Sequence, residues 1–258
     1  MTRIAIGIEY DGTSYSGWQA QGHAPSVQAE LERALGTVAD HPVELTAAGR
    51  TDAGVHALMQ VAHFDSDAPR ATEAWVLGGT AASAPDVSVL WARVVPDDFH
   101  ARHDARARSY RYRIINRRVR PALERGTACW VRRPLDAEAM HEAAQALLGE
   151  HDFSAFRAAE CQSKTPMRRL ESISVQRAGD HVVIEVTANA FLHHMVRNLS
   201  GTLIAVGGGD RPREWVAEVL AGRDRTRAGM TAPPQGLYFA GVRYDERHGL
   251  PTDPVGLG

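Results

Sequence analysis

The chain has 258 residues, of which 44% are hydrophobic and 23% are charged, with a formal net charge of −2. These values fit a globular protein of one large or two small domains, and no stretch of the sequence approaches the apolar length of a membrane span. The two cysteines, Cys129 and Cys161, are too few for a disulfide framework or a four-thiolate zinc site. We therefore expect a protein of the reducing cytoplasm, without a signal peptide.

The first hundred residues alternate between strand and helix patterns. Apolar residues at every second position predict a half-buried strand at 3–10, and Ser26 can cap the helix that follows the turn-rich segment 11–18. The remaining expected elements are a strand near 43–45, a turn at Asp52, a strand at 55–64, a helix around 72–77 and a strand at 87–91. The order is β-α-β-β-α-β, which is the split βαβ arrangement.

The second half repeats this order. We expect a strand at 109–115, a helix capped by Asp136 and stopped by Gly149, strands at 170–175 and 182–186, helices at 190–206 and 212–220, and a strand at 237–244. The fold class is thus α+β, with two ferredoxin-like halves, 1–104 and 105–246, and a tail at 247–258. We expect one continuous, mainly antiparallel sheet with helices on one side and a cleft for RNA and catalysis between the halves.

One short segment, A-G-R-T-D-A-G-V-H-A at 48–57, places an acidic residue on a tight turn. Asp52 lies between Gly49 and Gly54, with Arg50 two positions before it. Such a turn between two strands can hold a carboxylate at a fixed position, because glycine adopts backbone shapes that other residues resist. On spacing alone, the pattern favours an ordinary turn, in which Asp bonds to its own backbone.

The positive charge is concentrated in one stretch. Residues 101–133 contain eleven arginines and only two acids, Asp104 and Glu124. The guanidinium fork suits phosphate oxygens, so the stretch indicates either a phosphate-binding patch or a solvated charged face. Tyr110 and Tyr112, interleaved with arginines, suit stacking on RNA bases, although alternating tyrosines in a strand are also ordinary packing residues.

Several segments together resemble the tRNA pseudouridine synthase A family. The segment G-R-T-D-A-G-V-H-A resembles its active-site motif, and Y-D-G-T-S-Y-S-G-W at 10–18 resembles its N-terminal signature. Further matches are F-H-A-R at 99–102, R-S-Y-R-Y-R-I at 108–114, H-D-F-S-A-F-R at 151–157, F-L-H-H-M-V-R-N at 191–198 and G-L-Y-F at 236–239. The resemblance extends from about Ile4 to Tyr244.

The resemblance implies isomerisation of uridine to pseudouridine at positions 38 to 40 of the tRNA anticodon stem-loop. It implies that Asp52 is the catalytic carboxylate, that Arg197 is its partner, that Tyr110 contacts the substrate and that Leu237 lines the uracil pocket. It implies a homodimer and neither a cofactor nor a metal. For the adjacent His193 and His194 we expect packing or RNA contact, since neighbouring residues on a helix point in different directions.

The chemistry suggests further roles and leaves one open. Asp52 either attacks as a nucleophile or takes a proton from C2′. The target base must be flipped out of its stack, and Arg50 is our candidate for filling the vacated space. Tyr110 would stack on the flipped uracil and assist proton removal from C5.

Two other function classes compete with this reading. A non-catalytic RNA-binding protein of duplicated RRM-like fold would explain the sheets, tyrosines and arginines, but not a carboxylate beside two arginines. A glycosidase would normally need a second carboxylate, for which only Glu44 and Asp65 lie near the turn.

Overall fold

The computed structural model describes residues 1–22 and 24–251, and these divide into two compact units. The first unit consists of Met1–Ala107 and the chain from Tyr238 onward, and the second consists of Arg108–Leu237. Most of the expected tail, 252–258, lies outside the described residues. No helix in the described part of the chain has both the length and the apolar character that crossing a bilayer requires.

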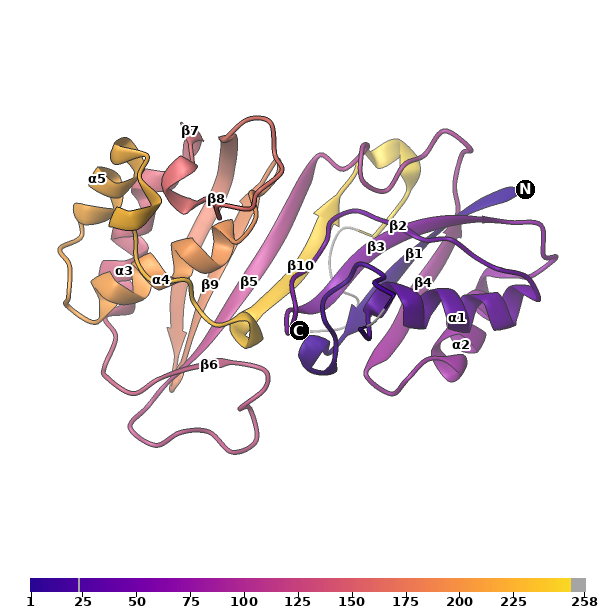
Figure 1. The fold of residues 1–258 in the computed structure, drawn as a ribbon, viewed down its shortest axis with the longest axis horizontal. Helices are drawn as coiled ribbons and strands as arrows, with labels where there is room; N and C mark the ends of the chain where they lie inside the picture. The colour runs from indigo at the N-terminus through magenta and orange to yellow at the C-terminus, as the bar shows by residue number, and fades with distance from the viewer. Residues whose placement is uncertain (23, 252–258) are drawn as a thin grey trace. The chain divides into compact units, whose positions relative to one another are not determined.

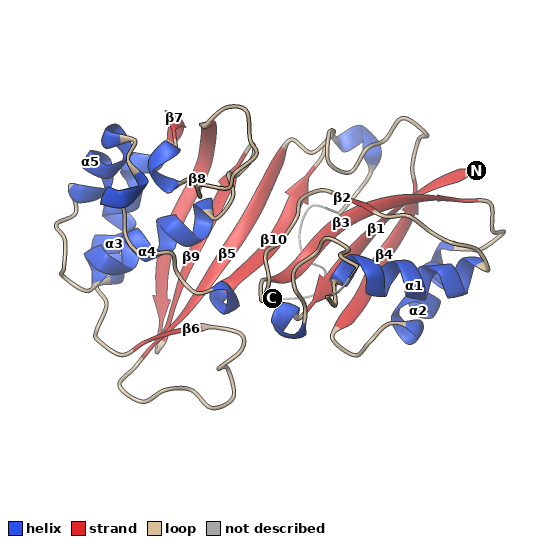
Figure 2. Cartoon of the chain, viewed as in Figure 1, coloured by secondary structure: helices blue, strands red, loops and turns tan. Residues whose placement is uncertain are grey.

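The first unit is a sheet with two helices (Figures 1 and 2). Its elements are β1 (Thr2–Tyr10), α1 (Val27–Ala39), β2 (Thr46–Ala47), β3 (His56–Ser66), α2 (Thr72–Ala82), β4 (Val87–Val94) and β10 (Leu237–Arg243). The strand order is β4-β1-β3-β10, with β2 also paired to β3. All pairs are antiparallel except β10 with β3. The predicted β-α-β-β-α-β order of this half is therefore confirmed.

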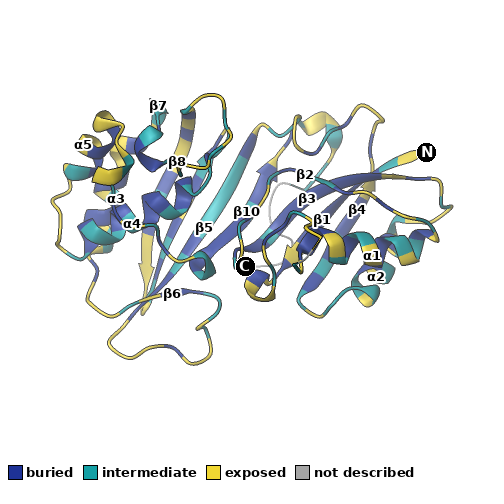
Figure 3. Cartoon of the chain, in the orientation of Figure 1, coloured by how far each residue is buried: buried dark blue, intermediate teal, exposed yellow. Residues whose placement is uncertain are grey.

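Strand β1 is more buried than the alternation predicts. Both faces are covered from Ile4 to Ile8, as the dark strand in Figure 3 shows. The indole of Trp91 in β4 explains the second buried face, because a Cβ at Gly7 would lie only 2.1 Å from its Nε1. The expectation of a half-buried strand is wrong, because the glycine at this position leaves room for the Trp91 indole over the strand.

The second strand of this order does not lie near 43–45 as expected. Its place is taken by β2, whose two residues pair with β3. The Leu45 N–H donates to Glu32 Oε1 of α1 at 2.9 Å, and the Leu45 carbonyl accepts from Gln28 Nε2 at 3.3 Å. Side chains of the helix thus satisfy the backbone groups that a strand partner would have satisfied.

The second unit is a sheet with three helices (Figures 1 and 2). Its elements are β5 (Ala107–Asn116), β6 (Cys129–Val131), α3 (Ala137–Ala144), β7 (Gly149–Asp152), β8 (Met167–Ala178), β9 (His181–Ala188), α4 (Met195–Gly207) and α5 (Trp215–Gly222). The order β5-β9-β8-β7 is antiparallel throughout, and β6 pairs with β5 in parallel. The short strands β6 and β7 were not predicted. The α+β class with mostly antiparallel strands is confirmed.

Single-turn 3-10 helices complete the described elements. They are η1 (Gly12–Ser14), η2 (Gln145–Leu147), η3 (Ser154–Phe156), η4 (Arg225–Arg227), η5 (Pro234–Gly236) and η6 (Glu246–His248).

Candidate active site

Asp52 lies on a tight turn between β2 and β3, as the sequence predicts. The Val55 N–H donates to the Asp52 carbonyl at 3.2 Å and closes the turn, with Gly54 in the left-handed region at φ 73°. The Asp52 side chain is half-buried, and Arg50 on the same loop is exposed. A carboxylate in this position is fixed by its backbone and still accessible to a reactant.

The N-terminal motif, residues 10–18, packs directly under this turn. The Gly54 N–H donates to the Tyr15 carbonyl at 3.3 Å, and the Trp18 N–H donates to the Thr51 carbonyl at 3.0 Å. Gly17, at φ 96°, lies so close that a Cβ would meet the Thr51 carbonyl oxygen at 2.6 Å. The two motifs, about thirty residues apart in sequence, therefore pack against each other around the Asp52 turn.

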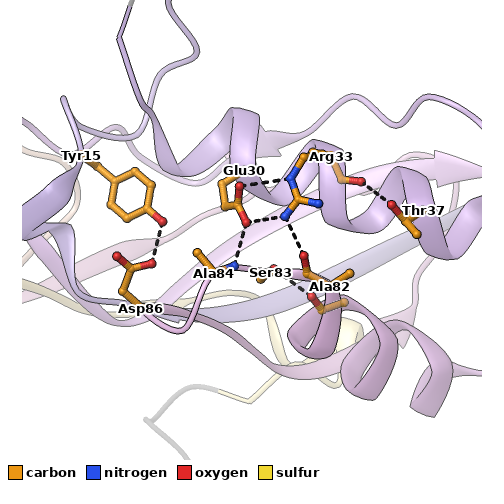
Figure 4. A network of polar contacts seen from close by, with 9 residues as sticks. Tyr15, Glu30, Arg33, Thr37, Ala82, Ser83, Ala84 and Asp86 are labelled. Atoms are coloured by element: carbon orange, nitrogen blue, oxygen red, sulfur yellow. Dashed lines mark hydrogen bonds and ion pairs between the residues drawn. The ribbon is translucent and has the colours of Figure 1, made fainter.

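Two sets of polar contacts fasten the N-terminal motif and helix α1 to the segment just before β4 (Figure 4). The Tyr15 hydroxyl donates to Asp86 Oδ1 at 2.6 Å, just before β4. Nearby, Glu30 Oε1 of α1 accepts from Arg33 Nη2 at 2.6 Å and from the Ala84 N–H at 2.7 Å. Hydrogen bonding to Arg33 is the main reason that the pKa of Glu30 is lowered. These contacts tie the support of the Asp52 turn, and α1, to the segment just before β4.

His56, the histidine of the active-site motif, is buried under the same loop. Its Nδ1 accepts from the Gly12 N–H at 3.1 Å when the ring is neutral there, and Asp11 Oδ1 lies 3.1 Å from the same nitrogen. The ring stacks on Tyr238 of β10, with centroids 4.7 Å apart. Burial opposes ionisation of Asp11, but hydrogen bonds from Thr13 and the charge of His56 outweigh it and lower the pKa of Asp11.

Tyr110 and Tyr112 of β5 have different surroundings. Tyr110 is half-buried, and its ring packs edge-on against Phe191 with centroids 4.9 Å apart. Tyr112 is fully buried, and its hydroxyl donates to the Pro233 carbonyl at 2.8 Å. Base stacking is therefore excluded for Tyr112, which is a packing residue, and stays a prediction for Tyr110.

Arg197 lies in the first turns of α4 and is half-buried. Its Nε donates to the Ala232 carbonyl at 2.8 Å, and the Ala232 N–H donates back to the Arg197 carbonyl at 3.1 Å. The guanidinium is thus held against the 229–236 segment, which ends where β10 begins. Leu237, the first residue of β10, is buried.

The two adjacent histidines contradict the expectation for this segment. Helix α4 begins at Met195 rather than near 190, because His194 has φ 58° and the Met195 N–H donates to the Leu192 carbonyl at 3.0 Å. His193 and His194 therefore lie on a turn, not on a helix, and their rings lie side by side with centroids 4.0 Å apart. The expectation that they point in different directions is wrong.

Asp65 and Glu44, the two residues near the turn that could supply the second carboxylate of a glycosidase, have different surroundings. Asp65 of β3 forms a two-bond pair with Arg3, at 2.9 and 2.8 Å, and this pairing is the main reason that the pKa of Asp65 is lowered. Glu44 is exposed on the segment before β2. A carboxylate held in its ionised form by Arg3 cannot serve as a general acid near neutral pH, so Asp65 does not fit that role.

Residues 117–128 of the arginine-rich stretch form a largely exposed loop between β5 and β6. Arg117 pairs with Asp180 at 3.7 Å, and Arg133 pairs with Asp210. Within the described part of the chain, no carboxylate pairs with Arg118 or Arg120, which are exposed. These two cations remain available to an anionic partner.

Comparison with known proteins identifies the family. The model of a family described as tRNA pseudouridine synthase matches residues 6–104 and 143–245. The chain belongs to the tRNA pseudouridine synthase family. It is 58% identical to the tRNA pseudouridine synthase A of Xanthomonas euvesicatoria over 253 residues, which is 97% of this chain and 98% of the relative. It is 56% identical to the tRNA pseudouridine synthase A of Stenotrophomonas maltophilia, over 97% of this chain and 98% of the relative.

The pseudouridine synthase match includes most of the residues singled out above. Asp52, Arg197 and Leu237 lie inside the matched ranges, whereas Tyr110 and the arginine-rich loop fall between them. The supporting contacts of Tyr15 and Thr51 were not foreseen from the sequence. The glycines at 12, 17 and 54 were the signal that backbone segments approach closely here.

Proposed function

We propose that this protein is a tRNA pseudouridine synthase of the cytoplasm that isomerises uridine to pseudouridine at positions 38 to 40 of the anticodon stem-loop. The observation that carries the proposal is the family motif at 49–57 folded around a half-buried, fixed carboxylate. High identity to relatives named tRNA pseudouridine synthase A supports the reaction class. Two free cysteines support a reducing compartment.

The reaction breaks the N1–C1′ bond of uridine, turns the uracil and joins C5 to C1′, after which C5 loses its proton and N1 gains one. We assign Asp52 as the catalytic carboxylate. Either it attacks the electron-poor centre as a nucleophile, or it removes a proton from C2′. Both roles require the ionised form, and we assign Arg197 as the cation that favours this form and orients it.

The target base must leave its stack before reaction. Unstacking costs a few kcal/mol, and contacts to the flipped base must offset this cost. We assign Tyr110 to stack on the uracil and to assist the final proton removal, and Leu237 to line the uracil pocket. Arg50 is exposed beside Asp52, which suits a residue that fills the vacated space in the stem.

A homodimer is part of the proposal, with tRNA as the substrate and no cofactor or metal required. The decisive experiment is tritium release from tRNA labelled with [5-³H]uridine. Release of the label without cleavage of the chain supports a pseudouridine synthase. Binding of tRNA without release would indicate a non-catalytic RNA-binding protein, and release of free uracil would indicate a glycosidase.

A further inference from the structure

A buried hydrogen bond joins the end of β1 to the residue next to Asp52. The Tyr10 hydroxyl and Thr51 Oγ1 are 2.7 Å apart, and the two residues are only 2% and 7% exposed. Thr51 is held a second time through its carbonyl, which accepts from the Trp18 N–H at 3.0 Å. The residue before Asp52 is therefore fixed through both its backbone and its side chain.

Gln60 of β3 holds the same loop three residues before Asp52. It is fully buried, and its Nε2 donates to the Gly49 carbonyl at 2.7 Å. Ile8 of β1 is the strand partner of Gln60, and the register shifts between Ile8 and Tyr10. Such an irregularity re-aims the side chain at its end, here Tyr10.

The chemistry of Tyr10 suits a fixed support rather than a reactive group. Burial raises the pKa of Tyr10 far above its ordinary value, against hydrogen bonds to Thr51 and Gln60 that lower it. The hydroxyl therefore stays neutral at every working pH. A phenylalanine and a valine would fill the space of Tyr10 and Thr51 without any buried polar atom. A fully satisfied polar pair also fixes the orientation of the two side chains, since hydrogen bonds prefer one geometry.

We propose that Tyr10 is a positioning residue for the reaction, acting through Thr51 to hold the Asp52 carboxylate in its reactive orientation. This inference rests on the proposed function, because it assumes that Asp52 is the catalytic group. A misplacement of about 1 Å in a reacting group can cost on the order of a hundredfold in rate.

The test measures single-turnover pseudouridine formation and tRNA affinity for Tyr10→Phe, Thr51→Val and the double variant. We expect each single variant to slow the reaction by roughly tenfold to a hundredfold, with the dissociation constant for tRNA unchanged within about twofold. The double variant should be no slower than the slower single variant, because both changes break the same hydrogen bond. Thr51→Ser, which keeps the hydroxyl, should restore most of the rate.

Tyr244→Phe is the matched control. Tyr244 is also buried in the first unit, and its hydroxyl donates to the Ala101 carbonyl at 2.6 Å. The control should lose comparable thermal stability but keep the parent rate. Equal slowing in Tyr244→Phe and Tyr10→Phe, or a parent rate in Tyr10→Phe, would overturn the inference. If Tyr10→Phe does not fold, the two Thr51 variants decide. Equal rates for Thr51→Val and Thr51→Ser would overturn the inference, whereas a slowed Thr51→Val beside a Thr51→Ser of parent rate would support it.

Asp52→Asn separates this inference from the proposed function. An inactive Asp52→Asn beside a Tyr10→Phe of parent rate would reject the positioning role alone. An active Asp52→Asn would reject Asp52 as the catalytic group and, with it, the positioning role.

Discussion

The Gly54 N–H donates a hydrogen bond to the Tyr15 carbonyl at 3.3 Å, so the turn that carries Asp52 is held by a segment outside its own motif. The Trp18–Thr51 bond holds the same loop from the other side of Asp52. The backbone of the loop can therefore shift little when a different side chain stands at position 52. The position of the carboxylate therefore depends on the segments that hold this turn.

Asp52 is the most direct target for mutation. Asn has nearly the same shape but no charge, and Glu moves the charge by one methylene group. We expect Asp52→Asn to bind tRNA at least as well as the parent, since a charge that repels phosphate is removed, and to form no pseudouridine. Asp52→Glu should be impaired by about a hundredfold or more. Filter binding and tritium release measure the two quantities. Measurable isomerisation by purified Asp52→Asn would rule out Asp52 as the catalytic residue.

Arg197 should matter more for turnover than for folding. Arg197→Ala removes the proposed partner of Asp52, and we expect turnover to fall by on the order of a hundredfold or more. It also removes the bond from Nε to the Ala232 carbonyl, which costs about 1 kcal/mol of stability. Arg197→Lys keeps the charge but loses the fork, so it should recover only part of the activity. A large fall in melting temperature with normal turnover per folded molecule would indicate a purely structural arginine.

Tyr110→Phe separates two roles of one ring. Phenylalanine keeps the face for stacking and the edge-on contact with Phe191, so tRNA binding should persist. If the hydroxyl assists removal of the C5 proton, the rate of tritium release should fall sharply. Tyr112→Phe is the comparison, because it removes a buried hydroxyl from the same strand. Normal tritium release by Tyr110→Phe would leave stacking as its only role.

The exposed arginines of the loop between β5 and β6 should contribute phosphate contacts. Each phosphate that is neutralised releases counterions, so tRNA affinity falls as salt rises, with a slope of about 0.7 to 0.9 in log units per contact. We expect Arg118→Ala with Arg120→Ala to reduce this slope by about one to two and to weaken all tRNAs alike. Including Arg117→Ala should add less, since Arg117 already pairs with Asp180.

The control for this prediction is an exposed arginine in an ion pair elsewhere. Arg213, which pairs with Glu142 of α3, meets that condition, and Arg213→Ala should leave the salt slope unchanged. A slope that is the same in the parent and in the Arg118/Arg120 variant would place this loop outside the RNA interface.

The buried ring of His63 should make the folding stability of the protein depend on pH. Burial, then the charge of Arg3, lowers the pKa of His63 to about 4, and its Nδ1 accepts from the Ala101 N–H at 3.2 Å. The unfolded chain takes up this proton near pH 6.5 but the folded chain does not. Stability is therefore full above pH 6.5 and falls as the pH drops toward 4, by on the order of 1–3 kcal/mol. Denaturant unfolding should show a smaller loss over this range in His63→Gln than in the parent. Part of the loss should remain in His63→Gln, because burial and then the charge of His103 also lower the pKa of His100. An equal loss in the two proteins would show that His63 does not contribute.

The residue pattern predicted most of the long elements because their apolar periodicity is local. It failed where a side chain from another element, or an unusual backbone conformation, decides the structure. The Glu32 carboxylate replaces a strand partner at Leu45, and the positive φ of His194 delays the start of α4. Periodicity also could not say which of Tyr110 and Tyr112 is buried, since both lie on the same face of β5. Short strands such as β6 contain too few residues to show a period.

For the candidate site, the motifs indicated which residues take part. The structure shows the hydrogen bonds that hold the loop around Asp52. Glycines marked the close approach of two segments, but which hydrogen bonds result depends on backbone positions that no pattern contains. The Tyr10–Thr51 pair illustrates this limit. In the sequence, Tyr10 is one more apolar-face residue of a strand, and only its distance of 2.7 Å from Thr51 distinguishes it.

Strand β10 has a consequence for how the protein is made. It is synthesised last, yet it pairs with β3 at His56 and Ala57, and Phe239 packs against Gly49 of the motif loop. While the ribosome is translating the second unit, the start of β3 at His56 and Ala57 lacks the partner that β10 later supplies. Such an unpaired strand edge is prone to pair with other chains. The loop around Asp52 gains this support only when the last strand emerges. A ribosome that stalls before residue 237 would therefore release a chain whose catalytic motif lacks the support of β10, however well its first hundred residues have folded.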